Sequence, residues 1–240
     1  MKVYLITSNK YTLSVCPVNI HFLNKYWKNI DITIVGYEDV DKLENLPNNV
    51  KVANVGIQED FGNTWTTALI PFFENVPEEY FVTILDDYIL MNPVDEDKIA
   101  TIEEQFKFKR VQKAMIGGGI PLSSASEYTE NLLIFNQNIP YRTSLHPSIW
   151  DKQYFLKYLK PGMTAWDFEL KNDAIARNDK AKIINYKYEY PKEPHLYSYL
   201  DLYTGGQLNI NEQAQLQIEM PSSRHFDNDD IRYIWESLQK

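Results

Sequence analysis

The sequence predicts an α/β protein in which one mostly parallel sheet is flanked by helices, and three observations support this fold class. Short runs rich in β-branched residues alternate with stretches of helical periodicity, as in βαβ units. An apolar run over residues 80–90 is interrupted by two adjacent carboxylates, Asp86 and Asp87, which is the pattern of a buried strand with charge at its exit. The chain of 240 residues is long enough for one sizeable core, so we expect a single domain over residues 1–240.

Composition describes an ordered globular protein and excludes several classes of function. Hydrophobic residues make up 44% of the chain and aromatic residues 14%. The formal net charge of −9 argues against a protein whose main function is to bind a nucleic-acid backbone, because such proteins are basic. Cys16 is the only cysteine, so no intrachain disulfide and no cysteine-based zinc site can form. We see neither a signal peptide nor an apolar run of about 20 residues, and we expect a cytoplasmic protein.

The first half of the chain predicts strands and covering helices in alternation. Strands are expected at residues 3–7, 31–36 and 50–55. Ile20, Leu23 and Trp27 recur at helical spacing after Pro17, which a first helical turn tolerates, and Cys16 is then a small buried hydrophobe. A second helix is expected over residues 64–73.

The strand at residues 3–7 runs into a polar loop, Ser8-Asn9-Lys10. In a βα unit this loop receives the ligand, so a nucleotide base or ribose could bind there. An ordinary connection explains the same residues equally well, since Ser and Asn favour loops through local hydrogen bonds. Trp65 leaves a similar choice between a core residue, which we favour, and a platform for the ligand.

Asp95 is a suitable N-cap for a helix carrying Ile99, Ile102 and Phe106, so we assign the acids at 95–97 to helix capping. Further on, a strand is expected at residues 131–136. Ser148 is then expected to cap a helix, and Asp227 to cap a terminal helix. The side chains expected on the helix after Ser148 are those of Trp150, Tyr154, Tyr158 and Leu159.

Asp86 and Asp87 are the strongest candidates for a metal site. Ligands collect outside the carboxyl ends of strands in an open α/β sheet, and two acids placed there can hold a cation that in turn holds a phosphate. A simple turn is the alternative. We favour the metal site because Tyr88-Ile89-Leu90 follow, without the Gly or Asn typical of a tight turn.

Asp167 and Glu169 lie near the start of a helix expected from residue 164. They are two residues apart and therefore about 200° apart around the helix axis, so only one of them can face a site. Trp166 and Glu169, three residues apart, share a face. Acids in a first turn also interact favourably with the helix dipole, which is the alternative explanation.

Three segments together resemble a known family: Leu85-Asp86-Asp87-Tyr88, then Ser148-Ile149-Trp150-Asp151-Lys152, then Trp166-Asp167-Phe168-Glu169. The chain resembles small bacterial and phage glycosyltransferases of the GT-A fold, which carry a DxD-type metal motif, here Asp-Asp-Tyr, and a Trp-x-Phe-Glu helix. The resemblance covers residues 1–210. Residues 7–11 also fit the family's first loop, although Asn9 stands where an Asp is usual.

The resemblance implies a nucleotide-sugar donor, expected to be a UDP-sugar, and an acceptor that is a glycan or another hydroxyl-bearing molecule. It implies Mn²⁺ or Mg²⁺ at Asp86 and Asp87, with His195 and His225 as further candidate ligands. Glu169, or failing it Asp167, would be the base, and the spacing of Trp166 and Glu169 favours inversion. Residues expected to contact the donor are Thr7, Ser8, Asn9, Tyr11, Trp65, Asp86 and a hinge at Gly205 and Gly206.

The implied GT-A-like domain would consist of a Rossmann-like nucleotide-binding half at residues 1–120, an acceptor half at 121–210 and a C-terminal segment at 211–240. Two other functions compete with this one. A nucleotidyltransferase shares the nucleotide-binding sheet, but Ser8-Asn9-Lys10 lacks the glycines of its usual phosphate loop. A non-catalytic module that binds a sugar or nucleotide is the second alternative.

Overall fold

The computed structural model describes residues 1–118, 122–188, 195–204 and 207–208. Its centre is a nine-stranded sheet in the order β3-β2-β1-β4-β9-β6-β10-β8-β7. The strands are β1 (Lys2–Ile6), β2 (Asp31–Gly36), β3 (Val50–Asn54), β4 (Tyr80–Leu85), β6 (Lys113–Met115), β7 (Ala125–Glu127), β8 (Leu132–Phe135), β9 (Ser148–Asp151) and β10 (Ile183–Tyr186).

Strand directions in this sheet are mixed but mostly parallel. The first four strands of the chain pair in parallel, with β1 between β2 and β4. Strand β9 runs antiparallel to both β4 and β6, and β8 runs antiparallel to β10 and β7. Of the described strands of this sheet, β8 and β9 therefore run against the other seven. The predicted α/β fold with a mostly parallel sheet is confirmed.

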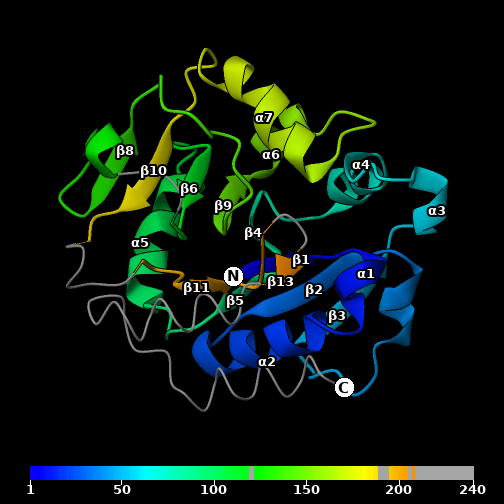
Figure 1. Cartoon of the computed structure of the whole chain (residues 1–240). Coiled ribbons are helices and arrows are strands. Elements are labelled where there is room, and N and C mark those ends of the chain that lie inside the picture. Colours follow the sequence, from blue (N-terminus) through cyan, green and yellow to red (C-terminus); the bar gives the residue numbers. More distant parts are fainter. Residues whose placement is uncertain (119–121, 189–194, 205–206, 209–240) are drawn as a thin grey trace.

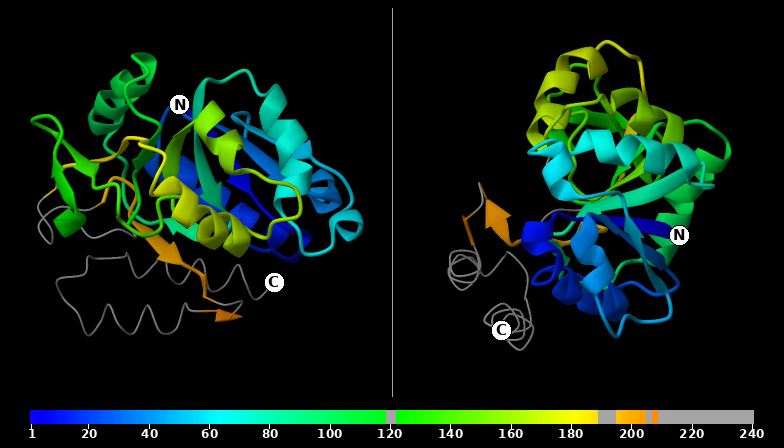
Figure 2. Two further views of the ribbon diagram at one scale, coloured as in Figure 1. Left: turned by 90° about the horizontal axis from the view of Figure 1, so that it is seen from above. Right: turned by 90° about the vertical axis from the view of Figure 1, so that its right-hand side faces the viewer.

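Helices cover both faces of the sheet (Figure 1). Helices α2 (Cys16–Tyr26) and α5 (Glu96–Lys107) pack on one face, and α4 (Thr66–Asn75), α6 (Lys152–Tyr158) and α7 (Ala165–Ala176) pack on the other. The side view in Figure 2 shows these layers stacked about the sheet. Successive side chains of a strand point to opposite faces, so β1 contributes Val3 and Leu5 to one hydrophobic core and Tyr4 and Ile6 to the other.

Short elements complete the described chain. They are α1 (Asn9–Thr12), α3 (Gln58–Phe61), the 3₁₀ helices η1 (Glu38–Lys42) and η2 (Leu122–Ser124), and the two-stranded sheets formed by β5 (Tyr88–Leu90) with β11 (Tyr199–Asp201) and by β12 (Tyr203–Thr204) with β13 (Gln207–Leu208). None of the helices in these ranges combines the length and apolar character needed to cross a bilayer.

Local sequence signals place most elements correctly. The three N-terminal strands lie within one residue of the predicted bounds. Asp95 caps α5 by accepting a hydrogen bond from the backbone N–H of Lys98, and Cys16 is buried in the core under α2. Gly205, Gly206, His225 and the helix expected after Asp227 lie outside the described residues.

The helix predicted from Ser148 is wrong at its start. Residues Ser148–Asp151 form strand β9, which fills the gap between β4 and β6 and hydrogen-bonds to both. Helix α6 begins at Lys152, and Asp151, whose side chain accepts from the Tyr154 N–H, is its N-cap. Trp150 therefore belongs to the sheet.

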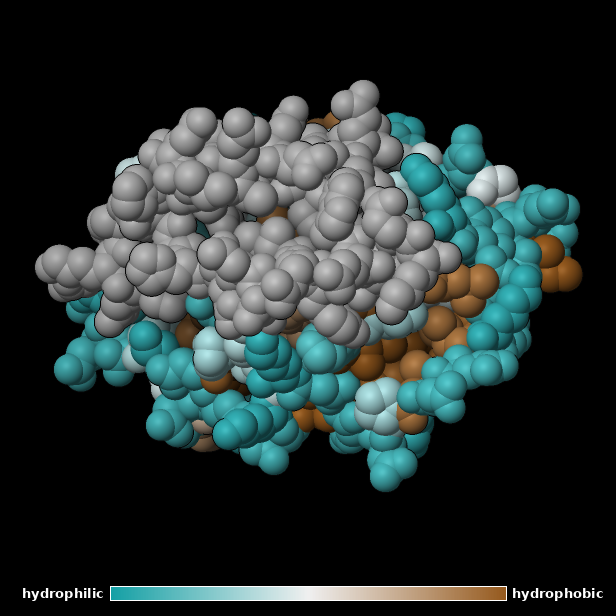
Figure 3. Space-filling model, turned by 60° about the horizontal axis from the view of Figure 1, so that its bottom comes forward, coloured by the Kyte–Doolittle hydropathy of each residue, from teal (hydrophilic) through white to brown (hydrophobic). Residues whose placement is uncertain are grey.

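Two smaller expectations also differ from the structure. The polar stretch after β1 is not a plain loop, because α1 begins at Asn9. Asp86 and Asp87 do form a turn, which connects β4 to β5, although Tyr88 follows directly. Where its residues are coloured, the face turned forward in Figure 3 is mainly hydrophilic, with hydrophobic residues gathered in places.

Candidate active site

Parallel pairing of β1 and β4 places the residues that follow these strands side by side. Ile6 is in register with Leu85, so Thr7 and Asp86 are the first residues past the two strand ends. A cavity of about 390 Å³ opens there. The lining includes seven residues predicted from the sequence, namely Thr7, Ser8, Tyr11, Trp65, Asp86, Asp87 and Glu169.

Asp86 is held rigidly at the base of this cavity. Its Oδ2 accepts a 2.6 Å hydrogen bond from Oγ1 of Thr7. The turn beneath it is fixed by Asn19 of α2, whose Nδ2 donates to the carbonyl oxygens of Asp86 (3.0 Å) and Tyr88 (3.2 Å). Burial raises the pKa of Asp86 to about 6, against the opposing effect of hydrogen bonds from the Thr7 side chain and the Ser8 backbone.

Asp87 lies in a strongly acidic environment. Its Oδ1 is buried and has no hydrogen-bond partner among the described residues. Burial first, and then the carboxylates of Asp86 and Asp201, raise the pKa of Asp87 to about 8. An acceptor oxygen left without a donor, beside two further carboxylates, is where a cation would be most stabilising.

Helix α7 brings Glu169 to the other side of the cavity. The backbone N–H of Leu145 donates a 2.5 Å hydrogen bond to Oε1 of Glu169, and the Thr143 hydroxyl donates to its carbonyl oxygen (3.0 Å). Burial raises the pKa of Glu169, while the Leu145 N–H and the positive charge of Lys113 oppose the shift. A carboxylate whose pKa is raised in this way is a better base than an exposed one.

Asp167 caps the start of α7 and does not line the cavity. Its carboxylate accepts from the Thr164 N–H, the Thr164 hydroxyl accepts from the Asp167 N–H, and the two form a capping box. Lys171 also pairs with Asp167 at 2.9 Å. The expectation that only one of the two acids faces the site agrees with this geometry, and that acid is Glu169.

Two tryptophans flank the cavity in different ways. Trp166 lines it with a side chain that is 64% exposed, so its ring is open to solvent at the rim next to Glu169. Trp65 packs edge-on against Phe168, with ring centroids 5.7 Å apart, and also lines the cavity. Trp65 therefore packs against the core and also faces the cavity.

Other candidate residues lie away from the cavity. Asn9 accepts from the Asp39 N–H through Oδ1, joining α1 to η1, and does not line the cavity. His195 lies beside Gly118 and Tyr188 and is not among the lining residues. Within the described ranges, no three His, Cys, Asp or Glu side chains are grouped closely enough to hold a metal ion by themselves.

Asp201 is a lining residue that the sequence analysis missed. Strand β11 pairs with β5 so that Asp201 stands opposite Tyr88, and the Leu202 N–H donates to the carbonyl oxygen of Asp87 (2.9 Å). The signal was an acid between the apolar residues Leu200 and Leu202, but only the strand pairing shows which cavity it reaches. The sequence analysis also missed Lys113 on β6, which does not line the cavity but lowers the pKa of Glu169 by its charge.

Comparisons with known proteins support the fold. No protein-family model matches the sequence, and a search of curated proteins finds no match. Residues 1–349 of TarS from S. aureus superpose with a TM-score of 0.53 at 11% identity, covering 100% of this chain and 71% of that one. An active-site mutant of LgtC superposes with a TM-score of 0.52 at 11% identity, covering 100% and 97%. A cytidylyltransferase from Leptospira borgpetersenii gives a TM-score of 0.50 at 11% identity, covering 95% and 97%. TarS and LgtC are GT-A glycosyltransferases, and this chain shares that fold with them.

Proposed function

We propose that this protein is a glycosyltransferase that moves a sugar from a nucleoside-diphosphate donor, expected to be a UDP-sugar, to an acceptor hydroxyl. One observation carries the proposal. A single cavity joins the acidic pair Asp86 and Asp87 to a separate carboxylate, Glu169, that stands beside the exposed ring of Trp166. Sugar transfer needs two such regions, one for the departing diphosphate and one for the attacking hydroxyl.

The acidic side of the cavity suits a diphosphate only if a cation accompanies it. The lining residues within the described chain include no Lys or Arg. Mg²⁺ is commonly bound by one or two carboxylates together with substrate phosphates, so a set of three protein ligands is not required. Asp87, with its unpartnered Oδ1, and Asp86 would hold Mn²⁺ or Mg²⁺, which would neutralise the charge that develops on the leaving diphosphate.

Glu169 suits the acceptor side. In the proposed reaction the acceptor oxygen forms a bond to the anomeric carbon as the bond from that carbon to the diphosphate oxygen breaks, and the hydroxyl proton passes to Glu169. Direct attack of this kind inverts the anomeric configuration. Its neighbour Trp166 offers an exposed aromatic face on which an acceptor sugar ring can pack.

A nucleotidyltransferase is the competing enzyme class, since a cytidylyltransferase shares the fold. Such enzymes attack the α-phosphate of a nucleoside triphosphate. Such enzymes usually carry a glycine-rich basic phosphate loop near the N-terminus. Ser8-Asn9-Lys10 has no glycine, and no Lys or Arg is among the described lining residues, which favours sugar transfer.

A donor panel tests the proposal. The protein is incubated with nucleotide sugars and Mn²⁺, and the released nucleotide is identified, with the Glu169→Gln variant as control. Release of nucleoside diphosphate in wild type, reduced in the variant, supports glycosyl transfer. Pyrophosphate release from a nucleoside triphosphate and a sugar phosphate would establish nucleotidyl transfer, and binding without release would establish a non-catalytic module.

A further inference from the structure

Lys113 is a fully buried lysine whose position the proposed reaction does not by itself explain. Its side chain on β6 has no exposed surface. Its Nζ donates to the carbonyl oxygens of Ser144 (2.6 Å) and Arg142 (3.2 Å) and lies 4.1 Å from the centroid of the Trp150 ring. In the part of the chain that the structure describes, it forms no ion pair. Burial lowers the pKa of Lys113 to about 7, against the opposing effect of the Glu169 carboxylate, so a lysine at this position is costly and calls for an explanation.

Both carbonyls that Lys113 binds belong to residues 142–145, a segment we call the strap. The strap lies along α7 and is attached to it at three points. The Arg142 N–H donates to Asp173 (3.2 Å), the Thr143 hydroxyl donates to the Glu169 carbonyl, and the Leu145 N–H donates to the Glu169 carboxylate. Lys113 thus hydrogen-bonds to one side of the strap, and the other side of the strap hydrogen-bonds to Glu169.

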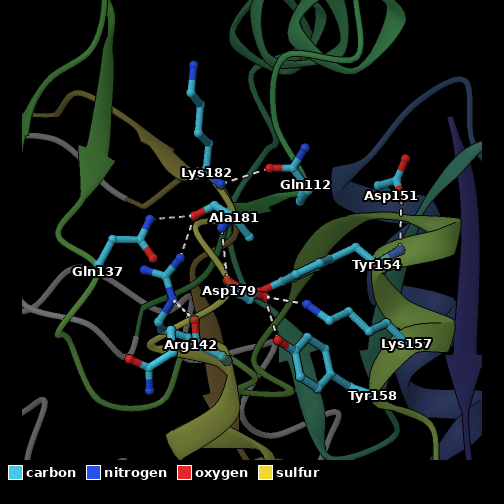
Figure 4. A network of polar contacts seen from close by, with 12 residues as sticks. Gln112, Gln137, Arg142, Asp151, Tyr154, Lys157, Tyr158, Asp179, Ala181 and Lys182 are labelled. Carbon is cyan, nitrogen blue, oxygen red and sulfur yellow. Dashed lines mark hydrogen bonds and ion pairs between the residues drawn. The ribbon is translucent and has the colours of Figure 1, made fainter.

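The far end of the strap is anchored by Arg142, which is also fully buried. Its guanidinium donates to the carbonyl oxygens of Ala176, Asn136 and Ala181, so it joins the end of α7 to the loops before β9 and β10 (Figure 4). Arg142 is fixed at one end and Leu145 is bound to Glu169 at the other. Between them the Thr143 hydroxyl binds Glu169, and Lys113 binds the Ser144 carbonyl from the opposite side.

We propose that Lys113 and the strap form a positioning device that fixes the Glu169 carboxylate toward the cavity. Lys113 is a positioning residue, because it acts on Glu169 through the Ser144 carbonyl and the Leu145 N–H and through its charge. The inference depends on the proposed role of Glu169 as the base. A reacting group displaced by about 1 Å can cost roughly 100-fold in rate, so a device that fixes a base accounts for the retention of a buried lysine.

The charge of Lys113 acts on Glu169 in a direction that can be measured. Lys113 lowers the pKa of Glu169, whereas Asp87 is a like charge that interacts with it. The titratable or charged groups that interact with either residue are Asp87, Tyr88, Arg142, His146 and Tyr199. Removing the Lys113 charge should therefore move the acid limb of the rate profile to higher pH.

The test compares wild type with Lys113→Met and a matched control, Lys152→Met, whose Nζ also donates to a backbone carbonyl, that of Val76, but on α6 and away from α7. Three quantities are measured: kcat across pH, affinity for UDP with Mn²⁺, and hydrogen exchange of the Leu145 amide by NMR. In Lys113→Met we expect kcat to fall by roughly 10–100-fold, the acid limb to move up, Leu145 exchange to accelerate and nucleotide affinity to stay unchanged. Lys152→Met should behave as wild type.

Wild-type kcat together with unchanged Leu145 exchange in Lys113→Met would overturn the inference. If that variant does not fold, Thr143→Val replaces it, because it removes a second contact of the strap with Glu169 at nearly constant volume. A reduced kcat with intact nucleotide binding is then expected, and wild-type kcat would overturn the inference. If wild-type protein transfers no sugar, the proposed function fails, but the Leu145 exchange rates still decide whether Lys113 holds the strap.

Discussion

Thr7 and Asp86, the first residues past two neighbouring parallel strands, are joined by a 2.6 Å hydrogen bond from the Thr7 hydroxyl to the Asp86 carboxylate. Both side chains are buried, with 4% and 7% of their surface exposed. This bond stabilises the ionised form of Asp86 against burial. It also holds the turn that places Asp87 at the cavity, so the position of Asp86 and Asp87 depends on Thr7, the residue that follows β1.

Thr7→Val should destabilise the fold because it removes the side-chain donor of a buried carboxylate, which keeps only backbone donors. We expect a loss of about 1.5–3 kcal/mol in the free energy of unfolding, measured by urea denaturation at neutral pH. Thr83→Val is the matched control. Thr83 is buried on β4, and its hydroxyl has no hydrogen-bond partner among the described residues, so this change should leave the free energy of unfolding unchanged or raise it. Equal losses in the two variants would show that the Thr7 bond contributes nothing specific.

Local patterns account for the parts of this fold that the sequence predicts. The positions of β1 to β4 follow from runs of apolar residues, and the neighbouring carboxyl ends of parallel strands bring Thr7, Asp86 and Asp87 together. Glu169 and Trp166 follow from the geometry of one helix. Each of these predictions needs only the periodicity of a single element or a general property of parallel sheets.

The missed features depend on pairing between distant segments. Asp201 reaches the cavity through the pairing of β11 with β5. Lys113 is linked to Glu169 indirectly, through hydrogen bonds of both residues to the strap, residues 142–145. The sequence predicted a helix in place of strand β9 because Trp150, Tyr154 and Tyr158 are spaced four residues apart, which is typical of a helix. In the structure Trp150 contacts Tyr154 from the end of a strand, with ring centroids 6.0 Å apart.

Without metal, the cavity acids should make stability depend on pH in a way that Asp87→Asn removes. The pKa of Asp87 is raised to about 8 in the folded protein, so its contribution to stability is fully present below about pH 4 and is lost as the pH rises toward 8. We therefore expect Asp87→Asn and wild type to have the same thermal midpoint near pH 4, with the variant more stable near pH 8. Calorimetry in EDTA measures both. A variant that is less stable at every pH would contradict this assignment.

Asp87→Asn should also abolish stabilisation by divalent cations. Wild-type protein with UDP is expected to gain thermal stability on addition of Mn²⁺, with a larger gain at higher pH because protons compete for the same carboxylates. Asp97→Asn, which changes an exposed acid in the first turn of α5, is the control and should retain the full gain. Equal nucleotide affinity in wild type with and without EDTA would remove the metal from the proposed mechanism.

Trp166→Ala should weaken acceptor binding while sparing the donor. Loss of one exposed aromatic face is expected to raise the KM for the acceptor by roughly 2–10-fold, with donor hydrolysis by water unchanged. Ile175→Ala is the control, since Ile175 is 59% exposed on the same helix and does not line the cavity. Steady-state kinetics against acceptor concentration distinguish the two. An unchanged KM in Trp166→Ala would place the acceptor elsewhere.

Glu169→Gln and Asp167→Asn should differ in kind, because one carboxylate faces the cavity and the other completes a capping box. The glutamine keeps the shape of Glu169 but cannot take a proton, so transfer should fall by roughly 10²–10⁴-fold while calorimetry shows nucleotide binding nearly intact. The amide oxygen introduced by Asp167→Asn can still accept from the Thr164 N–H, so this variant should show a small drop in thermal midpoint and largely unchanged turnover. The reverse result would exchange the two roles, and full activity in both variants would show that α7 is a scaffold and that the base lies on another element.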